Sequence, residues 1–290
     1  MDYENIEKDV LDKLLKLSGQ SKIARMQGSA TLAIEISISN FVFGKVLVIN
    51  SGYYSNRMHD ICKSYMKNGK DIASISYLTF DEAIGLNDSF DWVIACSVET
   101  SRGTLRPLID LNRLAKSKNA KLMVDATASI GLEKNHHFAD LIAFSSCKGL
   151  FGLTGASFVA YSTKPNNYVS SLFLNIDNHL EKKVTGPYHS ICSLYNVLPK
   201  IDLYRETVLR AKKDFINRFR KYLNVSNKYQ PLLCTFVTNK IISNDPRSVL
   251  YVPRDLNFGS IVCHLGEAHR IDEKDCRINN YLEADYESFD

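Results

Sequence analysis

Two residues with complementary chemistry stand where predicted strands of this sequence end. Asp125 closes the apolar segment KLMVD, and Lys148 follows the segment AFSSC. In open α/β sheets, ligands bind beyond the carboxyl ends of the strands. We therefore expect a carboxylate and an amine at corresponding edges of one sheet, where the amine can act as a nucleophile. The alternative interpretations are a helix cap at Asp125 and a solvated loop lysine at Lys148.

A third candidate segment, QGSAT, leads from Gln27 directly into an apolar helical pattern. Helix starts bind phosphate because their first backbone N–H groups have no partner within the helix. Two hydroxyl groups, on Ser29 and Thr31, would add to such a site. The plainer alternative is a helix cap, since Ser and Thr are frequent there.

The elements that must position these residues alternate between strand-like and helix-like stretches from about residue 22 to 161. Helical patterns lie at Ala30–Phe43, Ser55–Asn68 and Pro107–Lys118. This alternation predicts an α/β fold with a mostly parallel sheet and helices on both faces. The strand candidates are nearly continuous in apolar residues, as expected for strands buried on both faces. They are Lys45–Asn50, Ile72–Tyr77, Trp92–Val98, Lys121–Asp125, Ala139–Ser145 and Ala156–Tyr161.

The chain changes character in its last third. A charged helix with short apolar segments predicts a small α+β domain, so we expect a large domain over residues 1–185 and a small one over 186–290. The tail from Ile271 shows no clear period, and no structure is predicted for it. The segments expected before the tail are helices at Tyr188–Val197 and Ile201–Leu223 and strands at Leu232–Val237, Ser248–Val252 and Ser260–Leu265.

Composition and charge argue against several functional classes. The net charge is +4, and acidic and basic residues are interspersed along the chain. The sequence therefore shows no cluster of basic residues of the kind that binds nucleic acid. No apolar run reaches the length of a membrane span, and the acidic, amphipathic start is unlike a secretory signal. Seven scattered cysteines without a C-x-x-C pair predict reduced thiols in the cytoplasm. His136 and His137 lack a further spaced ligand, so no metal site is predicted.

Five segments, taken together in their order, resemble class V (fold-type I) aminotransferases, which depend on pyridoxal 5′-phosphate (PLP). The likeness extends from Asp2 to Gly266 and is nearest to 2-aminoethylphosphonate–pyruvate aminotransferases, with alanine–glyoxylate aminotransferases more distant. It implies transfer of an amino group from a small amino compound, such as an aminophosphonate, to a 2-oxo acid such as pyruvate. The segments are MQGSATLAIE, VLVINSGYYSNRM, VETSRGTLRPL, LMVDATASIGLE and SSCKGLFGLTGASFVAY.

The resemblance also implies roles for individual residues. Lys148 is expected to hold PLP as a Schiff base and to move protons, and Asp125 to stabilise the protonated pyridine nitrogen. Tyr54 is expected to stack on the cofactor ring, its alternative being a core tyrosine. Ala30 stands where the family usually has Gly. Further contacts to the cofactor are expected from Gly28, Ser29, Ala30, Thr31, Thr100, Ser101, Thr127 and Ser145.

Thr185 matches a residue that in this family reaches the cofactor phosphate of the neighbouring subunit. The resemblance therefore implies a homodimer with shared active sites. The alternative is a loop threonine ahead of the helix that follows Pro187.

Two departures from the family pattern limit what the resemblance implies. The family usually begins with a Pro- and Gly-rich segment over the active site, and this sequence starts where that segment would end. Truncation, a shortened gene and supply by another polypeptide are all open. Ile261 stands where the family carries the Arg that binds the substrate carboxylate. Arg25, Arg57, Arg102 and Arg254 are candidate replacements, Arg102 being equally compatible with a surface residue.

The loss of that arginine keeps two alternatives open. One is a PLP-dependent lyase or decarboxylase on the same fold, for which a missing carboxylate ligand matters less. The other is a catalytically degenerate, aminotransferase-like subunit that needs a partner polypeptide.

Overall fold

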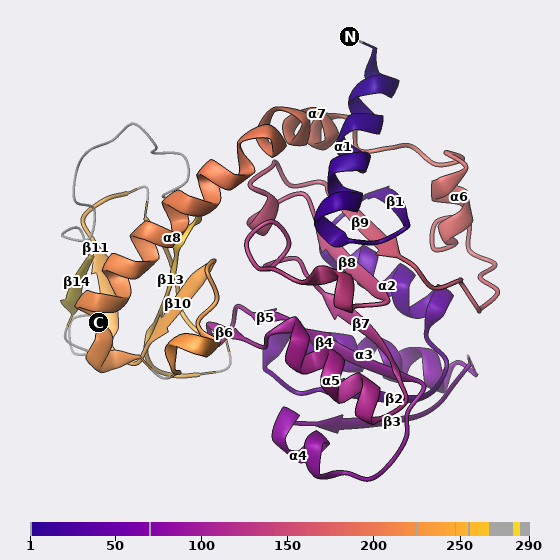
Figure 1. Cartoon of the computed structure of the whole chain (residues 1–290), viewed down its shortest axis with the longest axis horizontal. Coiled ribbons are helices and arrows are strands. Elements are labelled where there is room, and N and C mark those ends of the chain that lie inside the picture. Colours follow the sequence, from indigo (N-terminus) through magenta and orange to yellow (C-terminus); the bar gives the residue numbers. More distant parts are fainter. Residues whose placement is uncertain are drawn as a thin grey trace.

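A seven-stranded sheet forms the centre of the chain, and helices lie on both of its faces (Figure 1). The computed structural model describes residues 2–69, 71–223, 225–246, 248–254, 256–266 and 281–284. The strand order is β1-β9-β8-β7-β4-β2-β3, with β2, β3, β4, β7 and β8 parallel to one another. Only β9 is antiparallel to both of its neighbours in this sheet. The predicted α/β architecture with a mostly parallel sheet is confirmed.

The strands of this sheet lie where apolar runs predict them, with one addition. The sequence does not predict β1, because Arg25 interrupts its apolar residues; Arg25 is buried here through an ion pair with Glu7. Strand β4 ends before the predicted Val98, which instead belongs to the short hairpin β5–β6. The bounds are β1 Lys22–Gln27, β2 Gly44–Ile49, β3 Ile72–Leu78, β4 Trp92–Cys96, β5 Val98–Glu99, β6 Thr104–Leu105, β7 Lys121–Asp125, β8 Leu141–Ser145 and β9 Ala156–Tyr161.

Alternate residues of the central strands pack into two apolar cores. Val46 and Val48 of β2 face the core shared with α2 and α3, while Leu47 and Ile49 face the core shared with α1, α5 and α7. Burial on both sides explains why the strands are apolar along their whole length. The helices are α1 Tyr3–Ser18, α2 Ala30–Phe41, α3 Tyr53–Lys67, α4 Phe80–Gly85, α5 Leu108–Ser117, α6 Ile176–Leu180, α7 Tyr188–Val197 and α8 Ile201–Arg218, with 3₁₀ turns at His136–Phe138, Lys148–Leu150, Leu198–Lys200, Arg220–Tyr222 and Asn227–Tyr229.

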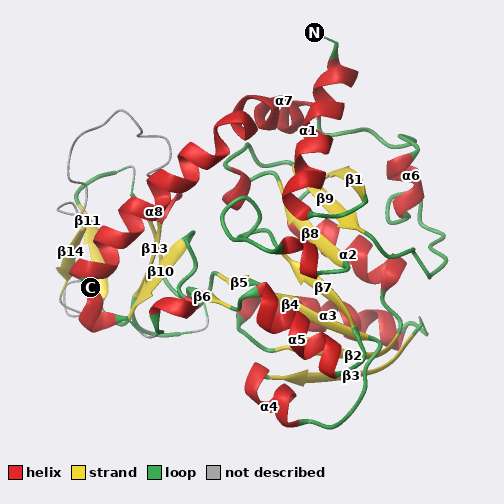
Figure 2. Cartoon of the chain, in the orientation of Figure 1, coloured by secondary structure: helices red, strands yellow, loops and turns green. Residues whose placement is uncertain are grey.

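The C-terminal part consists of antiparallel strands beside α8, a long helix that leads away from the central sheet (Figures 1 and 2). Three strands pair in the order β10-β13-β12, and β11 pairs with β14. An α+β arrangement is therefore present, as predicted, whereas the domain boundary at residue 185 stays a prediction. The bounds are β10 Cys234–Val237, β11 Lys240–Ser243, β12 Val249–Tyr251, β13 Ser260–Cys263 and β14 Tyr281–Ala284.

Two predictions for this part are wrong. Helix α8 ends at Arg218 instead of Leu223, because the chain tightens into a 3₁₀ turn where Phe219 packs on Phe215, with ring centroids 4.6 Å apart. The sequence predicts no structure for the tail, yet the tail contributes β14. Its Tyr281 is buried against Phe215, a long-range contact that local periodicity does not reveal. Residues 267–280 and 285–290 lie outside the described part.

Among the described residues, no helix combines the length and the apolar character that crossing a membrane requires. The cytoplasmic location stays a prediction.

Candidate active site

Asp125 and Lys148 line one pocket at the carboxyl edge of the sheet. Asp125 is the last residue of β7, and Lys148 follows the end of β8, the neighbouring strand. Tyr54, at the start of α3, forms another wall of this pocket, and its ring centroid lies 4.8 Å from the Nζ of Lys148. The predicted meeting of an amine, a carboxylate and an aromatic ring is present in the structure.

The carboxylate of Asp125 is nearly buried and is oriented by fixed donors. Its Oδ1 accepts hydrogen bonds from the backbone N–H of Thr127 at 2.9 Å and from the Thr127 hydroxyl at 2.6 Å. The Sγ of Cys96 lies 3.9 Å from Oδ2. Burial, and then the Asp125 carboxylate, raise the pKa of the Cys96 thiol well above its usual value, so this thiol stays a donor. These contacts hold the carboxylate in one orientation.

The backbone around Lys148 is held in an uncommon conformation. Lys148 has a φ of 50°, in the left-handed region that residues other than Gly rarely adopt. Its neighbour Gly149 packs against the loop that follows Asp125, where a Cβ atom at Gly149 would lie 2.1 Å from the carbonyl oxygen of Ile130. Such strain persists only where the surrounding structure enforces it, and it is concentrated at functional sites.

The start of α2 forms the end of the pocket that suits a phosphate group. Ala30 and Thr31 line the pocket, and the N-cap residue Ser29 makes no side-chain capping bond. The N–H of Gly28 donates to the carbonyl oxygen of Gly155 at 2.9 Å, and Gly28 is not among the lining residues of the pocket, so its contact with the cofactor stays a prediction. Helix starts attract anions through free N–H groups and the helix dipole.

Arg57 adds a cation to this end of the pocket. Its Nη1 donates to the Thr31 hydroxyl at 3.0 Å, and the residue lines the pocket. The sequence analysis considers Arg57 only as a replacement for the missing arginine that binds the substrate carboxylate, and it does not predict a contact between Arg57 and the phosphate. Its spacing from Tyr54, one helical turn along the same segment, is the signal that could have found it.

Glu99 is a buried acid whose role the sequence does not reveal. Its Oε2 accepts the backbone N–H groups of Tyr54 and Ser55 at 3.1 and 3.2 Å, and its Oε1 accepts the N–H and the hydroxyl of Ser101 at 3.2 and 2.7 Å. A carboxylate at a helix start stabilises the helix. Glu99 therefore fixes the first turn of α3 and, with it, the position of Tyr54.

A larger cavity of about 390 Å³ shares Tyr54, Thr100 and Lys148 with the pocket. Its other walls come mainly from the antiparallel strands of the C-terminal part. Lys148 therefore lies between a small pocket at the sheet edge and a chamber that can receive a second molecule. The remaining lining residues are Ser101, Leu233, Cys234, Leu250, Tyr251, Val252, Arg254, Ile261, Cys263 and Leu265.

Residues 8–174 match the family described as Aminotransferase class-V. The chain belongs to the class V aminotransferases.

Curated relatives of this class V aminotransferase include two proteins whose names state a phosphonate substrate. The bifunctional phosphonoacetaldehyde hydrolase/aminoethylphosphonate transaminase of Clostridioides difficile is 27% identical over 229 residues, which are 70% of this chain and 36% of that protein. The 2-aminoethylphosphonate–pyruvate transaminase of Pseudomonas putida (strain W619) is 29% identical over 223 residues, or 68% of this chain and 60% of that protein. The chain spans less than two thirds of the length of either relative.

Solved structures of other aminotransferases share the fold. Pyridoxamine–pyruvate aminotransferase from Mesorhizobium loti superimposes with a TM-score of 0.74 at 17% identity, covering 93% of this chain and 83% of that one. Alanine–glyoxylate aminotransferase from Nostoc sp. gives a TM-score of 0.73 at 17% identity, covering 92% and 84%. These likenesses confirm the fold-type I architecture.

Membership of the class V aminotransferases implies PLP as the cofactor, and the residues of the pocket fit it. An amine, a carboxylate and an aromatic ring surround the pocket, at Lys148, Asp125 and Tyr54. An uncapped helix start with Arg57 beside it provides for a doubly charged phosphate. Among the described residues, no cluster of His, Cys, Asp or Glu could hold a metal ion.

Not all residues expected at the cofactor line the pocket. Thr100 and Thr127 line it, and Ser101 lines the larger cavity. Ser145 is buried at the end of β8, where its hydroxyl lies 3.3 Å from the Cys147 Sγ. Thr185 is exposed and lines neither cavity. Its expected role concerns a neighbouring subunit and stays a prediction.

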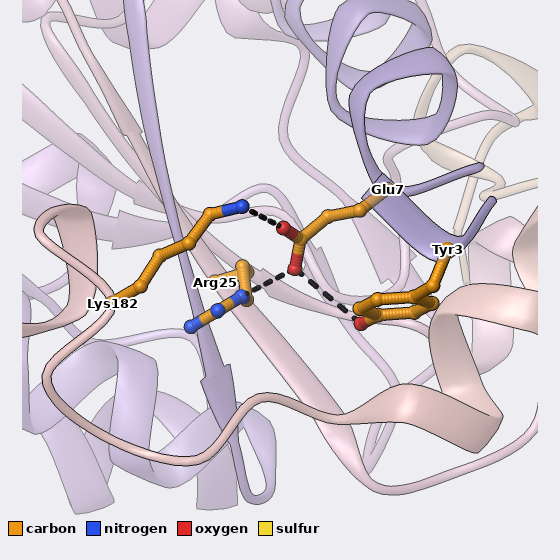
Figure 3. A network of polar contacts seen from close by, with 4 residues as sticks. All are labelled: Tyr3, Glu7, Arg25 and Lys182. Atoms are coloured by element: carbon orange, nitrogen blue, oxygen red, sulfur yellow. Dashed lines mark hydrogen bonds and ion pairs between the residues drawn. The ribbon is translucent and has the colours of Figure 1, made fainter. Parts of the chain in front are cut away.

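The four arginines considered as carboxylate ligands occupy different places. Arg25 is buried and bound to Glu7, with an Nε–Oε1 distance of 2.7 Å, in a network that includes Tyr3 and Lys182 (Figure 3). Neither Arg25 nor Arg102 lines the pocket or the larger cavity. Arg57 lines the pocket, and Arg254 lines the larger cavity.

Proposed function

We propose that this chain is a PLP-dependent aminotransferase that moves an amino group from a small amino compound, of the aminophosphonate kind, to a 2-oxo acid such as pyruvate. The observation that carries the proposal is the placement of Lys148, Asp125 and Tyr54 around one pocket that adjoins a larger cavity. The names of the curated relatives support the phosphonate substrate.

In this proposal each residue has a definite task. PLP, when bound, withdraws electrons from the carbon that bears the substrate amino group. Asp125, oriented by Thr127, holds a proton at the pyridine nitrogen. Tyr54 stacks on the ring, while Thr31, Arg57 and the start of α2 hold the phosphate.

Lys148 anchors the cofactor and moves protons. It lines both the pocket and the cavity, so its amine reaches a substrate that enters from the cavity. There it would take a proton from the carbon that bears the amino group and deliver it to C4′ of the cofactor, and in the opposite half of the reaction it would move a proton from C4′ to the carbon of the 2-oxo acid. The left-handed backbone at Lys148 aims the side chain into this position.

The direct test is a product assay with the full chain, PLP and pyruvate. We expect alanine to form with 2-aminoethylphosphonate or a related amine as donor, and no alanine with Lys148→Ala. A lyase would release its product without forming alanine, which would reject transamination. Bound PLP without turnover of any amine would favour the degenerate subunit.

The proposed assembly is a homodimer in which Thr185 of one subunit reaches the active site of the other. Mixing Lys148→Ala chains with Thr185→Trp chains tests it, because one of the two sites in a mixed dimer would then contain both native residues. We expect the mixture to be active although each variant alone is inactive. If Thr185→Trp alone is fully active, the shared site is rejected.

A further inference from the structure

The larger cavity has an uneven distribution of charge. Most of its walls are apolar, through residues such as Leu233, Leu250 and Leu265. Lys148 and Arg254 are the cationic side chains among its described lining residues, and none of these residues is acidic. Arg254 is itself exposed on this wall, so water screens its charge and the binding of an anion depends on direct, charge-assisted hydrogen bonds to the guanidinium.

Arg254 is held at this wall by aromatic rings. Its guanidinium carbon lies 4.9 Å from the ring centroid of Tyr53 and 5.9 Å from that of Tyr54. Hydrogen bonding to Arg57 and Arg254 lowers the pKa of the Tyr53 hydroxyl. Within the described part of the chain, Arg254 forms no ion pair with a carboxylate. The two rings and the hydrogen bond to Tyr53 hold the guanidinium near the cavity, and a guanidinium has five N–H donors, so donors remain for an anion.

Ile261 lies on the same cavity and is almost completely buried. An apolar side chain cannot bind a carboxylate or a phosphonate, so the position at which the sequence predicts the missing arginine offers no anion site. A guanidinium is nevertheless present in this chamber, on a different segment. One cavity thus combines an amine at Lys148 with a guanidinium at Arg254.

We infer that Arg254 binds the anionic end of the amino substrate, a carboxylate or a phosphonate, while the amino group of that substrate lies at Lys148. The inference rests on the proposed function and narrows the substrate to a short amine that carries an anionic group. Guanidinium groups bind both kinds of anion through two parallel hydrogen bonds. Arg254 is then the residue that determines specificity for amines with an anionic group over amines without one.

The test measures anion binding without chemistry. Calorimetric titration of the PLP-loaded full chain with ethylphosphonate and with propionate, neither of which carries an amine, reports on the anion site alone. We expect Arg254→Gln to weaken binding of the preferred anion about 10- to 100-fold, as loss of a charge-assisted hydrogen bond does. Arg254→Lys should restore part of the lost affinity, because the positive charge remains but the two parallel N–H donors of the guanidinium are lost. The anion that loses more affinity identifies the natural group.

A matched control is Arg113→Gln, which makes the same chemical change at an exposed position of α5. It should leave both titrations unchanged. In turnover, Arg254→Gln should raise the KM for 2-aminoethylphosphonate while leaving the KM for n-propylamine, which has no anionic group, nearly unchanged. Equal anion binding by wild type and Arg254→Gln would overturn the inference even where PLP binds and amines react. If wild type binds PLP but neither anion, the inference also fails.

The two proposals fail in separable ways. Absence of PLP binding by wild type removes the proposed function and the inference together. A normal PLP spectrum with normal turnover, combined with an unchanged KM for anionic amines in Arg254→Gln, removes only the inference.

Discussion

The carbonyl oxygen of Ile130 lies so close to Gly149 that a Cβ atom built there would be 2.1 Å away. This contact packs the loop that carries Lys148 against the loop that follows Asp125. Gly149→Ala must therefore push the two loops apart. We expect a loss of roughly 1–3 kcal/mol in the free energy of unfolding, typical of an overpacked site, and weaker PLP binding. Urea denaturation and PLP titration measure the two effects, and unchanged values in both would contradict the account.

Tyr54 offers a test of ring stacking that separates the ring from its hydroxyl. Tyr54→Phe keeps the aromatic face and should bind PLP nearly as wild type does. Tyr54→Leu removes the face, and we expect the PLP dissociation constant to rise about 10-fold, in line with the energy of an aromatic pair. Fluorescence titration with PLP gives both constants. If the two variants bind PLP equally, Tyr54 does not stack on the cofactor.

Glu99 should act through Tyr54 because it accepts the backbone N–H groups at the start of α3. In Glu99→Gln an amide NH₂ must face one of these donors. We expect a loss of about 1–3 kcal/mol in unfolding free energy, as for buried donors left without an acceptor, together with weaker PLP binding. Ser101→Ala is the control, since it removes a single donor and should destabilise less. Equal effects of the two variants would argue against this positioning role.

The burial of His136 predicts part of the loss of folding stability at acidic pH. Burial lowers its pKa to about 4, and its Nε2 lies 3.1 Å from the Ser129 hydroxyl. In the unfolded chain the usual value is about 6.5, so the unfolded state binds more protons between these pH values. Stability should therefore fall as the pH decreases from 6.5 towards 4, with a contribution approaching ~3 kcal/mol from this residue.

The measurement for His136 is the unfolding free energy at pH 7 and at pH 4.5 for wild type and His136→Gln. Gln keeps a hydrogen-bonding group but cannot titrate in this range. The variant should lose less stability than wild type between the two pH values. An identical loss would show that His136 does not contribute to the pH dependence.

The sequence predicts the framework of the site well because the relevant signals are local. Each buried strand is an apolar run bounded by polar residues, so the amino-acid pattern alone places the ends of β7 and β8. Asp125 is the last residue of β7, and Lys148 comes shortly after the end of β8. The parallel order of neighbouring strands then brings the two side chains to one edge.

The residues that escape prediction depend on contacts between distant segments. Glu99 meets the start of α3 from 45 positions away, and Arg57 meets Thr31 from 26 positions away. No short window of sequence records such pairs. The same reason explains why the sequence does not predict strands β1 and β14. In β1 a charged residue, Arg25, is buried among apolar ones, and in β14 the buried residue is a single aromatic one, Tyr281, so neither strand shows the usual apolar pattern.

We predict that Lys148 is the residue that holds PLP. Borohydride reduction of the PLP-loaded chain, followed by peptide mass mapping, identifies the residue that carries the cofactor. We predict a pyridoxyl group on the peptide that contains Lys148, and none on any peptide of the Lys148→Ala variant. A modified peptide elsewhere in the wild-type chain, with Lys148 unmodified, would contradict the account.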